Sequence, residues 1–344
     1  MSKMVDIAVV ILNWNGVDFL KRFLPGVLRN TSVPDMKVEV VVADNASTDD
    51  SVKYLKNKFQ NIRLIQLEEN FGFAKGYDLA LNQIQARYFV LLNSDVETPA
   101  DWLIPMVAYM DKHQDVAVSM PKLIWEKNRQ YFEYSGAAGG FIDVYGYTFC
   151  QGRIFDTIEK DEGQYDQIKE IFWATGACFV IRSDVYLDSG GLDHRFFAHM
   201  EEIDLCWRIH RMGYKVVYMP HSEVYHVGGG TLPSTNPFKT YLNFRNNLIL
   251  LMKNLPSKAL YRRLFQRLLL DFIAAINLLL KGSFRGFFAV FKAHWKFYGL
   301  FLELKRERGR VNYDIHSFRN IIYFRSIVFD YFFRKKKTFS RVDM

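Results

Sequence analysis

The sequence has only three cysteines, Cys150, Cys178 and Cys206, which lie far apart without a CxxC pair. This sparse, odd count excludes a disulfide-stapled scaffold and predicts reduced thiols in a cytoplasmic protein. We expect no secretory leader, because the first apolar run, residues 7–12, is short and ends at Asn13. No run reaches the roughly 18 apolar residues that a membrane-spanning helix needs.

Two further absences narrow the class of protein. Gly72 and Gly76 are four residues apart, so the stretch ENFGFAKGYD is not the GxGxxG fingerprint of dinucleotide-binding proteins. The chain also lacks the composition of a disordered protein, because 49% of its 344 residues are apolar and 16% are aromatic. This length and composition predict two domains, or one large domain with an appendage.

Charge divides the chain into two regions. Residues 1–235 hold 23 Lys and Arg against 31 Asp and Glu, whereas residues 236–344 hold 22 against 6. We therefore predict one domain over 1–235 and a basic, mostly helical region over 236–344 that meets a different partner.

The basic region mixes aromatic residues with Lys and Arg, as in the stretch FDYFFRKKKTFSR, and a long helix is expected over 259–281. Such amphipathic segments favour the surface of an anionic membrane. An ordinary helical subdomain with a basic surface is the alternative. Nucleic acid is not expected as a partner, because no recognition motif accompanies the charge.

The N-terminal region alternates apolar runs with helical patterns. Strands apolar on both faces between helices predict an α/β fold with a mainly parallel sheet. The strands are expected at 6–15, 38–47, 62–70 and 87–96, and the helices at 17–30, 49–59 and 73–86. Further along, residues 97–170 are less regular, and the Gly- and Tyr-rich stretch EYSGAAGGFIDVYGY is expected to be a loop. We expect a strand at 172–182 and a short strand at 214–220 that Pro220 closes.

Polar residues follow each of the first four predicted strands, at Asn13–Asn15, Asp44–Ser47, Asn70–Phe73 and Asn93–Asp95. In parallel sheets, ligands bind beyond the carboxyl ends of the strands. The sequence thus predicts a binding site at this edge.

Asp95 and His226 are candidate metal ligands. Asp95 follows a buried strand, and a hard divalent cation needs only one or two protein carboxylates when substrate phosphates complete its shell. His226 precedes three glycines and is a plausible second ligand. The alternatives are a turn-capping Asp95 and a structural His226.

The stretch HMEEIDLCWRIH, residues 199–210, carries three acids on a predicted helix. Asp204 and Arg208 are four residues apart, which predicts a structural ion pair. Glu201 and Glu202 lie nearer the helix start, where a catalytic base would face a cleft.

Seven motifs occur in an order that resembles family 2 glycosyltransferases, particularly the bacterial rhamnosyltransferase-like branch. They are VVILNWNG, VVADNASTDDS, NFGFAKG, LLNSDVETP, TGACFVIR, GGLDHRFFAHMEEIDLCWR and HVGGGT, within residues 5–232. The resemblance implies a GT-A fold, a dTDP- or UDP-sugar donor, a divalent cation (Mg²⁺ or Mn²⁺) and inversion at the anomeric carbon.

The resemblance also implies roles for individual residues. Asp95 takes the second acidic place of the family's DxD motif, with Asn93 in the first. The family's base motif falls on Glu201 and Glu202, with Glu202 in a place that is usually Asp; Asp78 stands where the family often has Asn. The expected nucleotide-sugar ligands are Asn13, Asn15, Asp44, Asn70, Gly72, Lys75, Asn93 and Ser94.

The resulting prediction is an inverting, metal-dependent glycosyltransferase at the cytoplasmic membrane surface, acting on a lipid-linked or cell-surface glycan. An inverting transfer needs one base for the acceptor hydroxyl, and Glu202 is the candidate, with Glu201 or Asp204 still open. The alternatives are a sugar nucleotidyltransferase and a non-catalytic nucleotide-sugar-binding protein.

Overall fold

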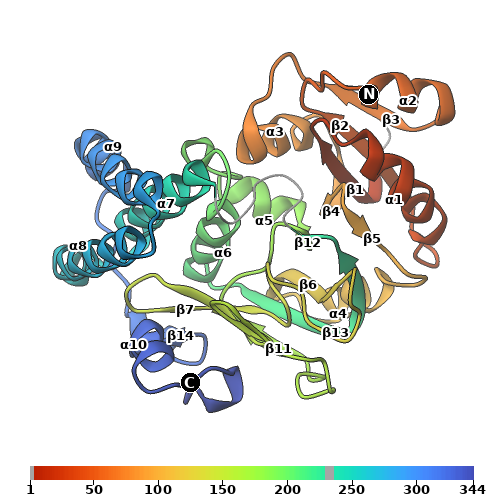
Figure 1. Ribbon diagram of the computed structural model, residues 1–344. Helices are drawn as coiled ribbons and strands as arrows, with labels where there is room; N and C mark the ends of the chain where they lie inside the picture. The colour runs from red at the N-terminus through yellow and green to blue at the C-terminus, as the bar shows by residue number, and fades with distance from the viewer. Residues whose placement is uncertain (1–3, 229–235) are drawn as a thin grey trace.

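A nine-stranded sheet forms the centre of the structure. The structure is a computed structural model that describes residues 4–228 and 236–344. The strand order is β11-β13-β6-β12-β4-β1-β2-β3, and β5 pairs with β13 (Figure 1). The strands are β1 (Val5–Asn13), β2 (Val38–Asp44), β3 (Arg63–Gln66), β4 (Ala86–Asn93), β5 (Val96–Glu97), β6 (Val116–Trp125), β11 (Lys169–Ile171), β12 (Cys178–Arg182) and β13 (Lys215–His226).

The first four strands are parallel and alternate with helices, as predicted. Strands β1 and β4 are apolar and almost fully buried, because helices cover both faces of this part of the sheet. The added strands make the sheet mixed, since β12 lies antiparallel between β4 and β6. The helices of this region are α1 (Val17–Asn30), α2 (Ser51–Lys58), α3 (Gly72–Leu81), α4 (Ile104–Lys112), α5 (Ser183–Asp188) and α6 (Glu201–Arg211).

The predicted end of a strand at Pro220 is wrong, because β13 continues to His226. Its pairing with β6 shifts register between Met219 and Glu223, which accommodates a proline that cannot donate to the ladder. The longer strand carries His226 to the edge where the other strands end.

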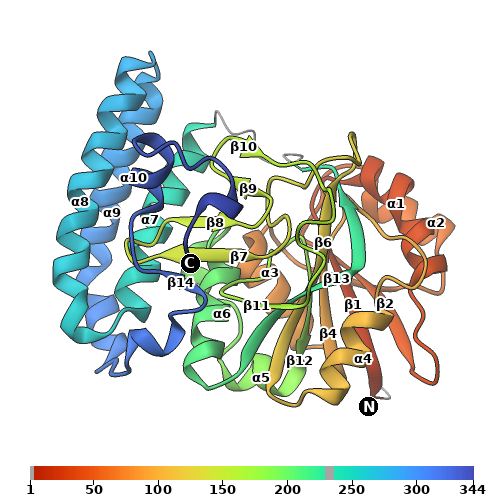
Figure 2. The same cartoon turned by 90° about the horizontal axis from the view of Figure 1, so that it is seen from below.

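A second sheet of five strands, in the order β10-β9-β8-β7-β14, forms mostly within the less regular region (Figure 2), and β7 lies in the stretch that was expected to be a loop. The sequence does not predict this sheet, because its strands are too short to show a sustained alternation of apolar and polar residues. Its last strand comes from the C-terminal segment and pairs in parallel with β7. The strands are β7 (Gly140–Asp143), β8 (Thr148–Cys150), β9 (Arg153–Ile154), β10 (Thr157–Ile158) and β14 (Ile322–Tyr323).

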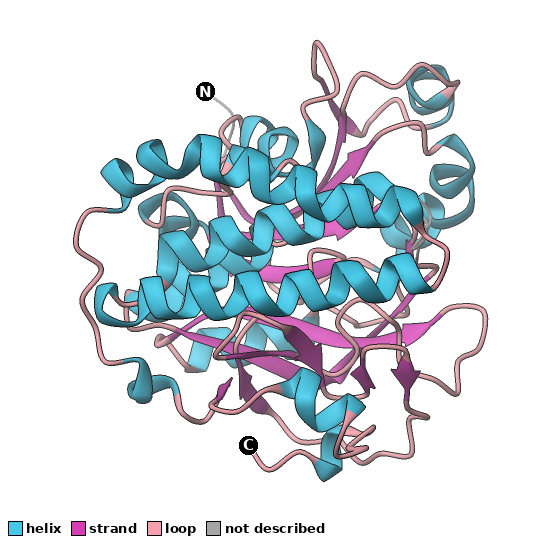
Figure 3. Ribbon diagram, turned by 60° about the vertical axis from the view of Figure 1, so that its left-hand side comes forward, coloured by secondary structure: helices cyan, strands magenta, loops and turns pink. Residues whose placement is uncertain are grey.

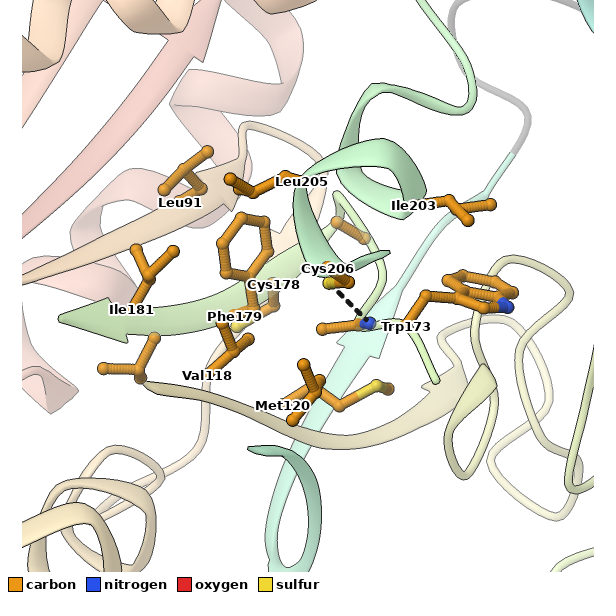
Figure 4. Close-up of a cluster of buried hydrophobic side chains, with 14 of the residues drawn as sticks. Leu91, Val118, Met120, Trp173, Cys178, Phe179, Ile181, Ile203, Leu205 and Cys206 are labelled. Carbon is orange, nitrogen blue, oxygen red and sulfur yellow. Dashed lines mark hydrogen bonds between the residues drawn. The ribbon is translucent and has the colours of Figure 1, made fainter. Parts of the chain in front are cut away.

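Helix α6 packs its apolar side onto the central sheet (Figure 4). Leu205 and Cys206 are buried among side chains of β12 and β6, and the Cys206 sulfur accepts a hydrogen bond from the Ala174 backbone at 3.5 Å. This contact fixes α6, so that its first turn lies at the sheet edge.

Three long helices cover one side of the molecule in a single layer (Figure 3). They are α7 (Pro237–Asn254), α8 (Ser257–Leu280) and α9 (Phe284–Arg308), and a short α10 (Ile327–Phe332) follows. The mostly helical C-terminal region is thereby confirmed. None of the described helices is both long enough and apolar enough to cross a membrane.

Candidate functional site

The ends of β1 and β2 meet in one buried hydrogen-bond network. The Asn13 side-chain nitrogen donates to Asp44 at 3.0 Å and to the Ser47 hydroxyl at 3.1 Å. The other Asp44 oxygen accepts from the Ser47 backbone at 2.9 Å. The predicted gathering of Asn13 and Asp44 at this edge is therefore present, with their side chains already bonded to each other.

Asn45, which the sequence reading passed over, joins this network to α3. Its side chain donates to Asn70 Oδ1 and to the Gly72 carbonyl, both at 3.0 Å, and accepts from the Phe71 backbone. The two predicted ligands Asn70 and Gly72 are thus held beside the end of β2.

The remaining predicted nucleotide-sugar ligands lie around the same edge. Asn15 is exposed, and its side-chain oxygen accepts from the Thr48 backbone at 2.7 Å, ahead of α2. Lys75 lies over the Phe71 ring at 3.9 Å. Asn93 ends β4, and its backbone donates to the Ala177 carbonyl. Ser94 follows directly, with its hydroxyl 3.3 Å from the place of a Cβ on Gly16.

Asp95 and His226, the predicted metal ligands, face each other, with His226 Nε2 3.2 Å from Asp95 Oδ1. The opposite ring nitrogen, Nδ1, lies 3.3 Å from the carboxylate of Glu133. Burial alone would lower the pKa of His226, but the carboxylates of Glu133 and Asp95 outweigh it and raise the pKa to about 10.

This arrangement fits a divalent cation whose shell is completed by a substrate. Among residues 4–228 and 236–344, no group of three or more His, Cys, Asp and Glu side chains is arranged to hold a metal by itself. Asp95 would supply a hard oxygen, and His226 Nε2 would supply a nitrogen once the cation has displaced the proton that the raised pKa retains, with Glu133 behind the imidazole.

A strained loop, residues 196–200, connects the edge where the parallel strands end to the start of α6. Phe197, His199 and Met200 all have positive φ, at 63°, 70° and 76°. The Phe197 carbonyl accepts from the Phe73 backbone at 2.8 Å. A Cβ on Gly72, whose own φ is 75°, would lie 2.6 Å from the Phe197 ring, so only glycine allows this approach.

Glu201 and Glu202 open α6 directly after that loop. Both carboxylates have a buried Oε2 atom without a hydrogen-bond partner. Burial raises the pKa of Glu202 to about 7. Burial and the neighbouring Glu202 raise the pKa of Glu201 well above its usual range. Both carboxyl groups therefore hold their protons to a higher pH than a solvated glutamate does, and their titrations are linked.

Glu202 lies near the carboxyl end of β4. A Cβ built on Gly176 would be 3.9 Å from its carboxylate carbon. The next residue, Ala177, accepts the hydrogen bond from Asn93 at 2.9 Å. Gly176 and Ala177 therefore connect the acid at the start of α6 to the edge that carries Asp95.

Asp204 has the structural role that the sequence predicts. Its carboxylate pairs with Arg208 at 2.9 Å and is fully buried. It also pairs with Lys253 at 2.7 Å and accepts from the Asn254 side chain at 2.7 Å, both on α7. With its oxygens taken by cations and an amide, Asp204 is not free to act as a base.

Helix α7 holds the strained loop from the other side. The buried Asn246 side-chain nitrogen donates to the carbonyls of Phe196, Ala198 and His199 at 2.7–2.9 Å. Arg245 donates to the Phe196 carbonyl at 3.0 Å. The C-terminal region thereby positions the loop that precedes Glu201 and Glu202.

Comparison with known proteins identifies the family. The model of the family described as "Glycosyl transferase family 2" matches residues 8–188, more than half of the chain. The chain is similar to N-acetylglucosaminyl-diphospho-decaprenol L-rhamnosyltransferase of Mycobacterium tuberculosis, with 27% identity over 238 residues that cover 63% of this chain and 75% of the relative.

Solved structures share the GT-A fold. GalNAc-T7 with UDP, GalNAc and Mn²⁺ aligns with a TM-score of 0.57 and 17% identity over 74% of this chain and 48% of that one, so the match spans about half of the larger protein. S. aureus TarS 1–349 in complex with UDP-GlcNAc aligns with a TM-score of 0.54 and 15% identity over 90% and 94% of the two chains.

Proposed function

The chain belongs to glycosyl transferase family 2, and from that premise we propose that it transfers a sugar from a dTDP- or UDP-sugar to a hydroxyl group with inversion. One observation carries this proposal. Glu202, a carboxylate with a pKa near 7, lies at the same sheet edge as the Asp95 and His226 pair.

Glu202 is proposed as the general base. A base is most effective when its pKa lies near the working pH, and the pKa of Glu202, about 7, meets this condition. Its carboxylate would take the proton of the acceptor hydroxyl as that oxygen attacks the anomeric carbon. The diphosphate leaves without needing a proton, so a second carboxylate flanking the bond is not required.

The donor is proposed to lie along the network of Asn13, Asp44 and Asn70. Asn15, Gly72, Lys75, Asn93 and Ser94 complete the proposed donor pocket. Asp95 and His226 would hold a divalent cation, Mg²⁺ or Mn²⁺, which supplies positive charge for the departing diphosphate.

The acceptor is proposed to be a lipid-linked or cell-surface glycan, and the transferred sugar a rhamnosyl or related hexosyl group. The name of the mycobacterial relative supports both choices. We propose that residues 1–235 act as the catalytic domain, while residues 236–344 place it at the cytoplasmic face of the anionic cell membrane. The excess of 22 basic over 6 acidic residues in the latter region supports this location.

A panel of nucleotide sugars tests the proposal. With Mn²⁺ present, slow hydrolysis of one dTDP- or UDP-sugar and release of the nucleoside diphosphate are expected. In a parallel reaction with a nucleoside triphosphate and a sugar 1-phosphate, formation of a nucleotide sugar with release of pyrophosphate would instead identify a nucleotidyltransferase. Binding of a nucleotide sugar without any turnover, even with extracted membrane glycolipids, would favour a non-catalytic binding protein.

A further inference from the structure

Helices α8 and α9 form a hairpin whose buried side is unusually polar. Arg267 and Asp271 on α8 are 4% and 0% exposed, and they pair at 2.6 Å. His294 on α9 meets the other Asp271 oxygen at 3.0 Å, and Arg267 also donates to the Tyr145 carbonyl. The three buried ionisable groups of the hairpin are thus satisfied by one another on its inner side.

The outer side of the same hairpin is apolar. On α9, large apolar residues recur at alternating intervals of four and three, which places them on one helix face. Trp295 is 85% exposed, and Leu280, at the end of α8, is 82% exposed. The exposed set is Tyr261, Phe265, Leu268, Leu269, Phe272, Ile273 and Leu280 on α8, and Phe284, Phe288, Phe291, Trp295, Tyr298 and Leu302 on α9.

These thirteen large exposed side chains are more than the scattered apolar residues that a water-facing helix pair carries. An exposed apolar face of this extent marks a site of interaction with a membrane or with another protein. The hairpin lies on the side of the molecule away from α1 and α2, so nothing else in the described structure covers it (Figures 1 and 2).

The positive charge around this apolar face favours an anionic lipid surface as the partner. Residues 257–308 contain eleven Lys and Arg against three Asp and Glu, and one of those acids, Asp271, is buried. Exposed cations such as Arg285, Lys292 and Lys296 stand among the apolar residues. A second copy of the chain would bring the same cations face to face, whereas an anionic lipid surface neutralises them.

We propose that the α8–α9 hairpin inserts its outer face into one leaflet of an anionic membrane and lies in the plane of the interface. This rests on the membrane association proposed above and specifies its segment and mode. The apolar side chains would enter the boundary between headgroups and acyl chains, while Lys and Arg contact lipid phosphates.

A site-specific fluorescent label tests insertion. Cys150, Cys178 and Cys206 are all buried, so an introduced surface cysteine can be labelled selectively. Leu280→Cys places an environment-sensitive NBD label on the hairpin. Lys53→Cys, labelled in the same way, is the matched control, because the Lys53 side chain on α2 is 75% exposed. With phosphatidylglycerol-containing vesicles, the label at 280 should shift to the blue and be quenched by doxyl lipids, while the label at 53 stays unchanged.

A second variant makes the test independent of labelling. Phe288→Glu combined with Trp295→Glu should reduce flotation with these vesicles at least tenfold, because it places two carboxylates on the outer face. Mn²⁺-dependent binding of UDP or dTDP should remain as in the parent chain, so failure of insertion is distinguished from failure of the transferase proposal.

Three results would overturn the inference. The first is equal flotation of the variant and the parent chain. The second is equally strong binding to pure phosphatidylcholine vesicles, which removes the anionic requirement. The third is a blue shift at position 280 that grows with protein concentration in the absence of lipid, which would identify a second copy as the partner.

Discussion

The Nδ1 atom of His226 lies 3.3 Å from the carboxylate of Glu133, whose side chain is only 1% exposed. A carboxylate behind a metal-binding histidine fixes the orientation of the ring and makes the other nitrogen a better ligand. That other nitrogen, Nε2, faces Asp95. Glu133 therefore belongs to the proposed metal site although it would not touch the ion.

Glu133→Gln should weaken Mn²⁺-dependent binding of UDP or dTDP by about 10- to 100-fold, because the amide orients His226 less strongly. Calorimetry with and without Mn²⁺ measures this change. Glu162→Gln, at an exposed position, serves as the control. Unchanged affinity in Glu133→Gln would leave Glu133 with a purely structural role.

Asp95→Ala should abolish the part of nucleotide affinity that depends on metal, since it removes the proposed carboxylate ligand. The same titration, run with Mn²⁺ and then with EDTA, separates this part from metal-independent binding. Asp18→Ala, at a side chain that is 91% exposed, should behave as the parent chain. A persistent Mn²⁺ effect in Asp95→Ala would place the cation elsewhere.

Glu202→Gln should retain donor affinity and reduce transfer by about 10²- to 10⁴-fold, the range expected for loss of a general base. Donor affinity is measured by calorimetry and transfer by release of the nucleoside diphosphate with acceptor present. The companion Glu201→Gln should lose less activity, because burial and the neighbouring Glu202 raise the pKa of Glu201 and favour its neutral form, which an amide resembles. Normal turnover by Glu202→Gln would exclude Glu202 as the base.

The pH profile of kcat/KM should follow the titration of Glu202. Its pKa is raised to about 7, so the carboxylate is protonated and inactive below that pH and active above it. We expect kcat/KM to rise about tenfold per pH unit on the acid side and to level off above pH 7. A flat profile between pH 5 and 7 would contradict this assignment.

Asn246→Ala should destabilise the protein by about 1–3 kcal/mol, because buried carbonyls of the strained loop lose their donor. Transfer should fall further than the loss of stability explains, since Glu202 follows this loop. Denaturant unfolding and the transfer assay measure the two effects, with Asn277→Ala on the exposed side of α8 as control. Full activity in Asn246→Ala would show that the loop holds its shape unaided.

The N-terminal strands and helices were predictable because their hydrophobic patterns are local. The polar strand ends at Asn13, Asp44 and Asp95 followed from the same patterns, since parallel strands end at one edge. Asn45 lies directly after Asp44 at the end of β2, so the same pattern could have identified it as a candidate site residue. Its contacts with Asn70 and Gly72 depend on packing between segments, which no local pattern encodes.

Other features required the folded chain. Glu133 lies in a stretch without periodicity, and only pairing of Glu133 with Leu123 on β6 brings it to His226. The exposed apolar face of α8 and α9 could not be identified from the sequence for a related reason. Their sequences show apolar and charged faces, but only tertiary packing reveals which face is buried.

The hydrogen bonds from Asn246 also bear on how such a chain can diverge. Three carbonyls of one loop depend on a single amide more than forty residues downstream. A lineage that reshapes the loop to admit a new acceptor must adjust α7 at the same time, so the two segments are expected to vary together. Exchanging the C-terminal helices between relatives to build chimaeras would break this match, unless residues 196–199 are exchanged with them.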